Sequence, residues 1–139
     1  MSRKSPRDEF RKAVLRRDGG RCVAPGCGKT GTDVHHLIER RLFPDGGYCE
    51  NNGVSLCSAH HLEAERTLLD PEDLRTAAGI CETVLPPGWD PGLQYDKWGN
   101  IIGADGRRYP GPLFWEDPVQ KALREGNMLR GFDYSWPQQ

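Results

Sequence analysis

Apolar residues at helical spacing predict a helix near the start of the chain. Phe10, Ala13 and Val14 share one face of this helix. Ser5-Pro6 supplies a cap and a proline at the first helical position, and Asp18-Gly19-Gly20 ends the helix. The segment is rich in Arg and Lys, so we expect a short basic helix that leads into the first cysteine.

Similar start and stop residues predict three further helices. They cover residues 58–66, 70–79 and 117–126, with Ser58 and Asp117 as N-caps of the first and the last. Strands are predicted from Asp33 to Ile38 and over Val54-Ser55-Leu56, because each apolar run lies between turn residues. Turn pairs on both sides of Ile101-Ile102 predict short strands there as well. The expected fold class is therefore α+β.

The length of the chain limits its domain organisation. Its 139 residues suit one domain, or one small domain with an extension. We expect a basic N-terminal helix (residues 1–20), a core (residues 21–80) and an aromatic, Pro/Gly-rich C-terminal extension (residues 81–139). A core this small is stabilised well by a bound metal, and five Cys and four His could provide the ligands.

The charge is unevenly distributed. Residues 1–17 carry seven Lys or Arg against two Asp or Glu, a net charge of +5, whereas residues 62–139 carry eight against thirteen, a net charge of −5. The overall net charge of −1 therefore does not argue against a nucleic-acid partner. The chain has no run of about 18 apolar residues and no apolar signal-peptide core, so we expect a cytoplasmic protein without a membrane partner.

Two short-spaced pairs of metal-ligand residues occur in the core. They are Cys22-x4-Cys27 and Cys57-x2-His60. Each spacing can form a knuckle whose side chains point inward, so the pairs can converge on one tetrahedral Zn²⁺. The alternative is that Cys22 and Cys27 are ordinary buried thiols. In a cytoplasmic protein paired cysteines more often bind metal than form disulfides, which favours the zinc site.

Three histidines remain for other chemistry. His35 and His36 are adjacent on a predicted strand, so their side chains project to opposite faces, and one can bind a metal while the other addresses a different group. His61, at the start of the next helix, is expected to face this strand. With Asn52, these residues form a candidate hydrolytic metal site. Cys49 and Cys81 lie outside both pairs and are expected to be plain thiols.

These residues resemble the motif of the HNH endonuclease family. The similarity rests on Asp33-Val34-His35-His36-Leu37-Ile38, Asn52-Gly53-Val54-Ser55-Leu56-Cys57 and Ser58-Ala59-His60-His61, with Cys22 and Cys27 as the upstream zinc pair. It covers residues 21–66, and the segment from Leu85 is similar to the C-terminal part of some phage-borne HNH proteins. The resemblance implies a ββα-metal core with a zinc knuckle and flanking helices. It also implies a metal-dependent endonuclease that nicks or cuts DNA and leaves 5′-phosphate and 3′-hydroxyl ends.

The resemblance also implies roles for single residues. His35 takes the position of the first ligand of the catalytic cation, His61 that of the last, and His36 that of the general base. Asn52 either orients the base through the hairpin or binds the metal. Glu65 is an additional ligand or, as we favour, a solvated surface residue. Mg²⁺ is the expected cation, with Mn²⁺ or Ni²⁺ as substitutes.

One departure from the family pattern concerns the second knuckle. The family usually has Cys-x2-Cys followed directly by His, whereas here His60 stands in place of the second Cys. Histidine is a competent zinc ligand, so a Cys3His site is expected. In the alternative register, His61 binds the zinc and His60 has to reach the catalytic cation.

Basic residues are candidates for contacts with DNA phosphates. We expect these contacts from Arg40, Arg41, Arg16 and Arg17, and also consider Arg3, Lys4, Arg7, Arg11 and Lys12. A solvated basic face is the alternative interpretation for the N-terminal helix. The enzyme is expected to act as a monomer or homodimer. A non-catalytic zinc-knuckle module that binds nucleic acid is the alternative function.

Overall fold

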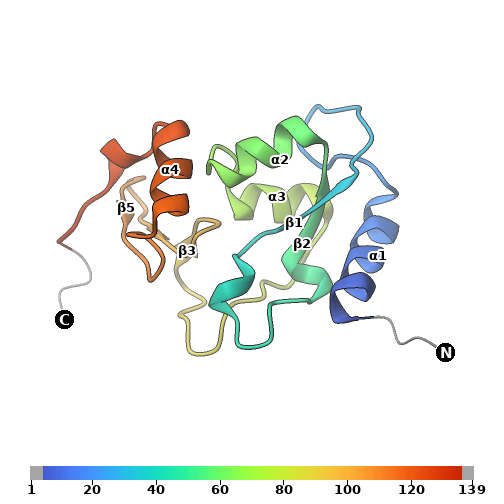
Figure 1. Cartoon of the computed structure of the whole chain (residues 1–139), viewed down its shortest axis with the longest axis horizontal. Coiled ribbons are helices and arrows are strands. Elements are labelled where there is room, and N and C mark those ends of the chain that lie inside the picture. Colours follow the sequence, from blue (N-terminus) through green and yellow to red (C-terminus); the bar gives the residue numbers. More distant parts are fainter. Residues whose placement is uncertain (1–4, 136–139) are drawn as a thin grey trace.

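The computed structural model describes residues 5–135 and confirms the α+β class (Figure 1). Over these residues the chain forms four α-helices: α1 (Pro6–Asp18), α2 (Ser58–Glu65), α3 (Pro71–Ala78) and α4 (Asp117–Glu125). A two-stranded antiparallel sheet consists of β1 (Asp33–His36) and β2 (Gly53–Leu56). A three-stranded antiparallel sheet consists of β3 (Gln94–Tyr95), β4 (Ile101–Ile102) and β5 (Arg108–Tyr109). None of the helices described is long and apolar enough to span a bilayer.

The β1–β2 hairpin is shorter than the sequence predicts. Asp33 pairs with Leu56 and His36 with Gly53, so β1 ends two residues before Ile38, where we expected it to end. The reason lies in the partner of Ile38, whose backbone N–H donates to the side-chain oxygen of Asn52 at 3.1 Å. The side chain of Asn52 thus accepts the hydrogen bond that a backbone oxygen of β2 would accept if the strand pairing continued.

Helix α1 covers one side of the hairpin (Figure 1). The Ser5 hydroxyl accepts a hydrogen bond from the backbone N–H of Asp8 at 3.2 Å, and the helix ends in a left-handed Gly19 with φ 65°, as predicted. Its buried residues Phe10 and Val14 pack against Gly53 at the start of β2. The absence of a side chain at Gly53 therefore allows α1 to approach the hairpin.

Helices α2 and α3 lie on the other side of the hairpin (Figure 1). Their contact with it forms a core that includes Leu37, Val54, Leu56, Ala64 and Leu74. All five side chains are buried. The hairpin is therefore covered on both sides, which explains why every residue of β2 is buried.

Two helix caps differ from the prediction by one residue. Cys57, and not Ser58, is the N-cap of α2, and it makes no side-chain capping hydrogen bond. Its sulfur lies instead 3.2 Å from the ring nitrogen of His60. Glu116, and not Asp117, is the N-cap of α4.

The C-terminal extension has a core of its own and also contacts the first part of the chain. Its core consists of Trp98, Leu113, Phe114, Val119, Leu123 and Phe132. The Trp98 indole N–H donates to the backbone oxygen of Glu65 at 2.8 Å. Arg108 is buried and pairs with Asp96 at 2.9 Å and with Asp70 at 3.1 Å. These contacts dock the extension against the end of α2 and the start of α3.

The contact between α1 and β2 leads to a first prediction. A Cβ at position 53 would lie 2.5 Å from Cζ of Phe10 and 2.8 Å from Cγ2 of Val14, both buried. We expect Gly53→Ala to lower the free energy of unfolding by about 2 kcal/mol through overpacking, as measured by urea denaturation. Gly131→Ala is the control, because a Cβ there meets nothing within 4 Å. Equal stability of the two variants would contradict this account of the packing.

Candidate functional site

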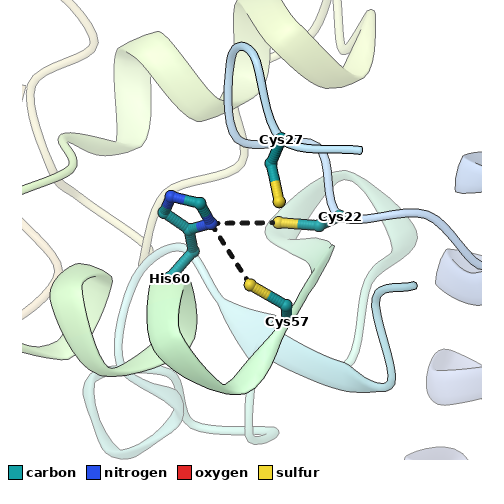
Figure 2. Close-up of side chains that lie close together, drawn as sticks. All are labelled: Cys22, Cys27, Cys57 and His60. Atoms are coloured by element: carbon teal, nitrogen blue, oxygen red, sulfur yellow. Dashed lines mark hydrogen bonds between the residues drawn. The ribbon is translucent and has the colours of Figure 1, made fainter. Parts of the chain in front are cut away.

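Three cysteines and one histidine converge between the hairpin and α2 (Figure 2). Cys22 and Cys27 come from the loop between α1 and β1, Cys57 follows β2, and His60 lies in the first turn of α2. The four ligand atoms lie within 4.8 Å of one another. His60 Nδ1 is 3.2 Å from Cys57 Sγ and 3.5 Å from Cys22 Sγ.

These distances are compatible with a structural zinc ion. Zinc bonds of about 2.3 Å to sulfur and 2.0 Å to nitrogen, arranged as a tetrahedron, separate an S and an N ligand by about 3.5 Å. The two observed S···N distances, 3.2 and 3.5 Å, are close to this value. The residues present therefore fit a Cys3His zinc site. Cys49 and Cys81 are exposed and lie outside the group.

The structure also separates the two adjacent histidines of α2. His60 faces the cysteines, whereas Nδ1 of His61 lies 3.0 Å from Oδ2 of Asp33 and its Nε2 lies 3.4 Å from Oε1 of Glu65. The alternative register, with His61 among the cysteines, is not the one adopted.

The pKa values of two cysteines in the group shift in opposite directions. A hydrogen bond from the backbone of His60, followed by the His60 side chain, lowers the pKa of Cys57 to about 7. Burial raises the pKa of Cys22. Of these two cysteines, Cys57 is thus the more readily converted to the thiolate that a metal requires.

A second group of potential metal ligands lies on β1 and α2. Ligand atoms of His35, His61 and Glu65 lie within 4.8 Å of one another. His61 and Glu65 are one helical turn apart on α2, and His35 faces them from β1. The solvated surface position that we favoured for Glu65 is wrong, because its side chain is only 33% exposed and takes part in this group.

Asp33 supports this second group, and the sequence analysis assigned it no individual role. Its carboxylate lies 3.0 Å from Nδ1 of His61, which leaves Nε2 of the same ring directed toward Glu65. A histidine that binds a metal typically donates its other ring N–H to a carboxylate in this way. The alternation of side chains along a strand could have predicted this contact, since Asp33 and His35 are two residues apart and therefore share a face of β1.

His36 lies on the opposite face of β1, as predicted from the alternation. Its ring stacks on Phe10 with centroids 4.7 Å apart and meets the edge of Tyr48 at 5.6 Å. Its Nε2 is buried and has no hydrogen-bond partner among the described residues. Burial, followed by the charge of Lys97, lowers the pKa of His36 to about 4.

His36 and two members of the second ligand group, His61 and Glu65, line the same cleft. This cleft has a volume of about 280 Å³, and its lining includes His36, His61, Glu65, Lys97, Glu39, Tyr48, Asp8, Arg7, Arg11 and Arg40. His36 thus borders the same space as the carboxylate of Glu65 and the imidazole of His61. Such a space can hold a small anionic group together with a cation.

The electrostatics of the second group follow from burial and pairing. Burial lowers the pKa of His35 well below its ordinary value. The hydrogen bond with Glu65 raises the pKa of His61. Burial alone would raise the pKa of Glu65, but the hydrogen bond with His61 and the charge of Lys97 lower it to about 2. Glu65 is therefore an anionic ligand at neutral pH.

Asn52 is placed beside the turn and not in the second ligand group. It is fully buried. Its amide nitrogen donates to the backbone oxygens of Ile38 at 3.1 Å and Gly47 at 3.2 Å, and its side-chain oxygen accepts from Ile38 N–H. Both ends of the amide are thus used to hold the connection between β1 and β2. Of the two roles considered, this geometry suits orientation of the hairpin.

The structure distinguishes among the arginines expected to contact DNA. Arg40 is exposed and lines the cleft, whereas neighbouring Arg41 pairs with Glu116 at 2.6 Å. Arg16 is exposed on α1 and is not part of the cleft lining. Arg17 pairs with Asp18 at 2.9 Å.

Arg17 also donates to two backbone oxygens of the hairpin region, those of Glu50 at 2.9 Å and Gly53 at 2.7 Å. Its side chain is only 17% exposed, so it holds α1 against the hairpin. Arg17 therefore has a structural role, and its contact with a DNA phosphate stays a prediction. Arg3 and Lys4 lie outside the described residues.

Lys97 was missed by the sequence analysis, which assigned no chemistry to the C-terminal extension. It enters the cleft from the turn between β3 and β4. Its Nζ lies 3.2 Å from Glu39 Oε1 and 3.5 Å from Glu65 Oε2. No local sequence pattern indicates this contact, because 58 residues separate Lys97 from Glu39.

Comparisons with known proteins give no relative for this chain: no protein-family model, curated protein or solved structure matches it.

The Cys3His group leads to a prediction about metal content. We expect Cys22→Ser to abolish retention of one zinc ion per chain and to lower the free energy of unfolding by about 3 kcal/mol or more. Zinc is measured by mass spectrometry and stability by urea denaturation. Cys49→Ser is the matched control, because Cys49 is exposed and outside the group. Full zinc retention by Cys22→Ser would exclude the site.

Proposed function

We propose that this protein is a metal-dependent HNH-type endonuclease that hydrolyses DNA phosphodiester bonds. The observation that carries the proposal is a shared cleft. His36, with an unpartnered ring nitrogen, borders the same space as His61 and Glu65, two members of the second ligand group. A general base beside a candidate cation site is the arrangement that metal-assisted hydrolysis requires.

The order of secondary-structure elements around the cleft supports the assignment of a ββα-metal core. Strands β1 and β2 form an antiparallel hairpin, α2 follows β2 directly, and the second ligand group joins β1 to α2. This is the order of elements expected of a ββα-metal core. The Cys3His group, to which α2 contributes His60, would hold the structural zinc of this core.

The chemistry of the second group suits a hard or borderline cation. Two imidazoles and one carboxylate accommodate Mg²⁺ less readily than Mn²⁺ or Ni²⁺, although Mg²⁺ is accepted where phosphate and water complete its shell. His35, His61 and Glu65 would hold the cation, and Asp33 would orient His61. When bound, the cation supplies positive charge to a phosphate oxygen and to the leaving 3′-oxygen.

His36 would accept the proton of the attacking water. The residue lines the cleft, and its Nε2 has no hydrogen-bond partner among the described residues, so the ring keeps a free site for a proton. The stacked ring of Phe10 and the edge of Tyr48 restrict the imidazole to one orientation. Asn52 contributes at a distance by fixing the connection that follows His36. Restriction of a base in this way lowers the entropic cost of reaching the transition state.

Removal of His36 tests the base assignment. We expect His36→Ala to lower the rate of supercoiled plasmid cleavage in Mg²⁺ or Mn²⁺ by about 100-fold or more. Circular dichroism and zinc content should remain as in the wild type, because His36 is outside the Cys3His group. The control is Lys121→Ala, an exposed position on α4.

Two outcomes would contradict this part of the proposal. Cleavage by His36→Ala at the wild-type rate would exclude His36 as the base. Wild-type protein that binds the plasmid but leaves it supercoiled in either cation would instead support the non-catalytic zinc-knuckle module. Nicked and linear products followed over time would show whether one strand or two are cut.

The adjacent arginines Arg40 and Arg41 provide a matched pair for the DNA contact. Arg40 lines the cleft, whereas Arg41 is engaged by Glu116. We expect Arg40→Ala to weaken DNA binding and to reduce the slope of log affinity against log salt concentration by about 1, because one phosphate contact is lost. Arg41→Ala should change neither quantity appreciably. Fluorescence anisotropy with a labelled duplex and no divalent cation measures both, and equal effects would remove Arg40 from the interface.

A further inference from the structure

Lys97 is a buried ammonium group that holds two carboxylates of the cleft. Its side chain is 5% exposed, and its Nζ lies 3.2 Å from Oε1 of Glu39 and 3.5 Å from Oε2 of Glu65. The backbone on both sides is fixed as well. The oxygen of Lys97 accepts a hydrogen bond from Glu39 N–H at 2.9 Å, and the Trp98 indole donates to the backbone oxygen of Glu65 at 2.8 Å.

The two oxygens of Glu65 therefore have different partners. Oε1 lies 3.4 Å from Nε2 of His61, within the second ligand group, and Oε2 faces Lys97. Glu39 also lines the cleft, and its side chain is only 13% exposed. Without Lys97, Glu39 would keep Arg41, whose Nε lies 3.5 Å from its Oε2, as its ion-pair partner, and Glu65 would keep only His61.

We propose that Lys97 is a positioning residue that limits the ligands of the cation site. By holding Glu39 and one oxygen of Glu65, it leaves the cation two imidazoles and a single carboxylate oxygen, with the remaining positions open to phosphate and water. The inference rests on the cation-binding part of the proposed function and not on DNA cleavage. It also makes the C-terminal extension a contributor to the site.

Two effects of removing Lys97 oppose each other. Loss of the ammonium would free Glu65 to move, which weakens cation binding, but it would also remove a positive charge that repels the cation and release Glu39 as a ligand. The second effect dominates. Glu65 is still held by His61 and by its place on α2, whereas a charge buried at this depth acts through a low dielectric constant.

The test is the affinity of the zinc-loaded, full-length protein for Mn²⁺ alone, followed by the electron paramagnetic resonance signal of free Mn²⁺. We expect Lys97→Met, which preserves most of the apolar stem, to bind Mn²⁺ about tenfold more tightly than the wild type. Glu39→Gln in the Lys97→Met background should abolish the gain. Lys121→Met is the control for charge, because it removes one positive charge from an exposed position on α4, outside the cleft, where solvent screens it; we expect a change of less than about twofold.

A second variant keeps the test decisive if Lys97→Met does not fold. Glu39→Gln alone leaves Lys97 paired only with Glu65, so we expect Mn²⁺ to bind about threefold more weakly. Unchanged or weaker Mn²⁺ binding by folded Lys97→Met, or an unchanged affinity in Glu39→Gln, would overturn the inference. Tighter binding by Lys97→Met in a protein that cuts no DNA would support it while overturning the proposed nuclease, and absence of Mn²⁺ binding in both proteins would overturn both.

Discussion

The antiparallel pairing of β1 with β2 is the constraint on which both ligand groups depend. The pairing of Asp33 with Leu56 places the start of β1 beside the residue that precedes Cys57, so the cysteine and the first turn of α2 are fixed relative to β1. Because the strand is extended, His35 faces α2 and its neighbour His36 faces α1. A shift of one residue in register would exchange the faces to which the two histidines point, so His35 would no longer lie beside His61 and Glu65.

The hairpin is too short to hold this register alone, and its surroundings supply what it lacks. Two four-residue strands form a marginal unit in water. Here α1 packs against one side through Phe10, and α2 and α3 cover the other. Asn52 closes the far end with hydrogen bonds to Ile38, and the Cys3His group joins the loop before β1 to the start of α2. The metal-compatible group therefore lies where the small core most needs a connection between segments distant in sequence.

The sequence predicted those parts of the site that depend on local spacing. Cys57 and His60 are one helical turn apart, and strand alternation separates His35 from His36, so neither feature requires knowledge of the tertiary fold. What could not be predicted depends on contacts between distant segments. Lys97 reaches Glu39 across 58 residues, and Arg40 and Arg41 diverge because a short 3₁₀ helix, Arg40–Leu42, and Glu116 of the extension determine their directions. Glu65 was misplaced for the same reason, since Lys97 of the extension lies 3.5 Å from its carboxylate.

The local charge of the cleft, and not the net charge of the chain, governs what can enter it. The net charge of −1 averages a basic start and an acidic remainder. Among the residues that line the cleft, four are Arg or Lys and three are Asp or Glu: Arg7, Arg11, Arg40, Lys97, Asp8, Glu39 and Glu65. Lys97 sets one positive charge against the carboxylates of Glu39 and Glu65, while the arginines of the rim face solvent. A divalent cation bound there would make the cleft distinctly positive, and this potential would attract a phosphate group.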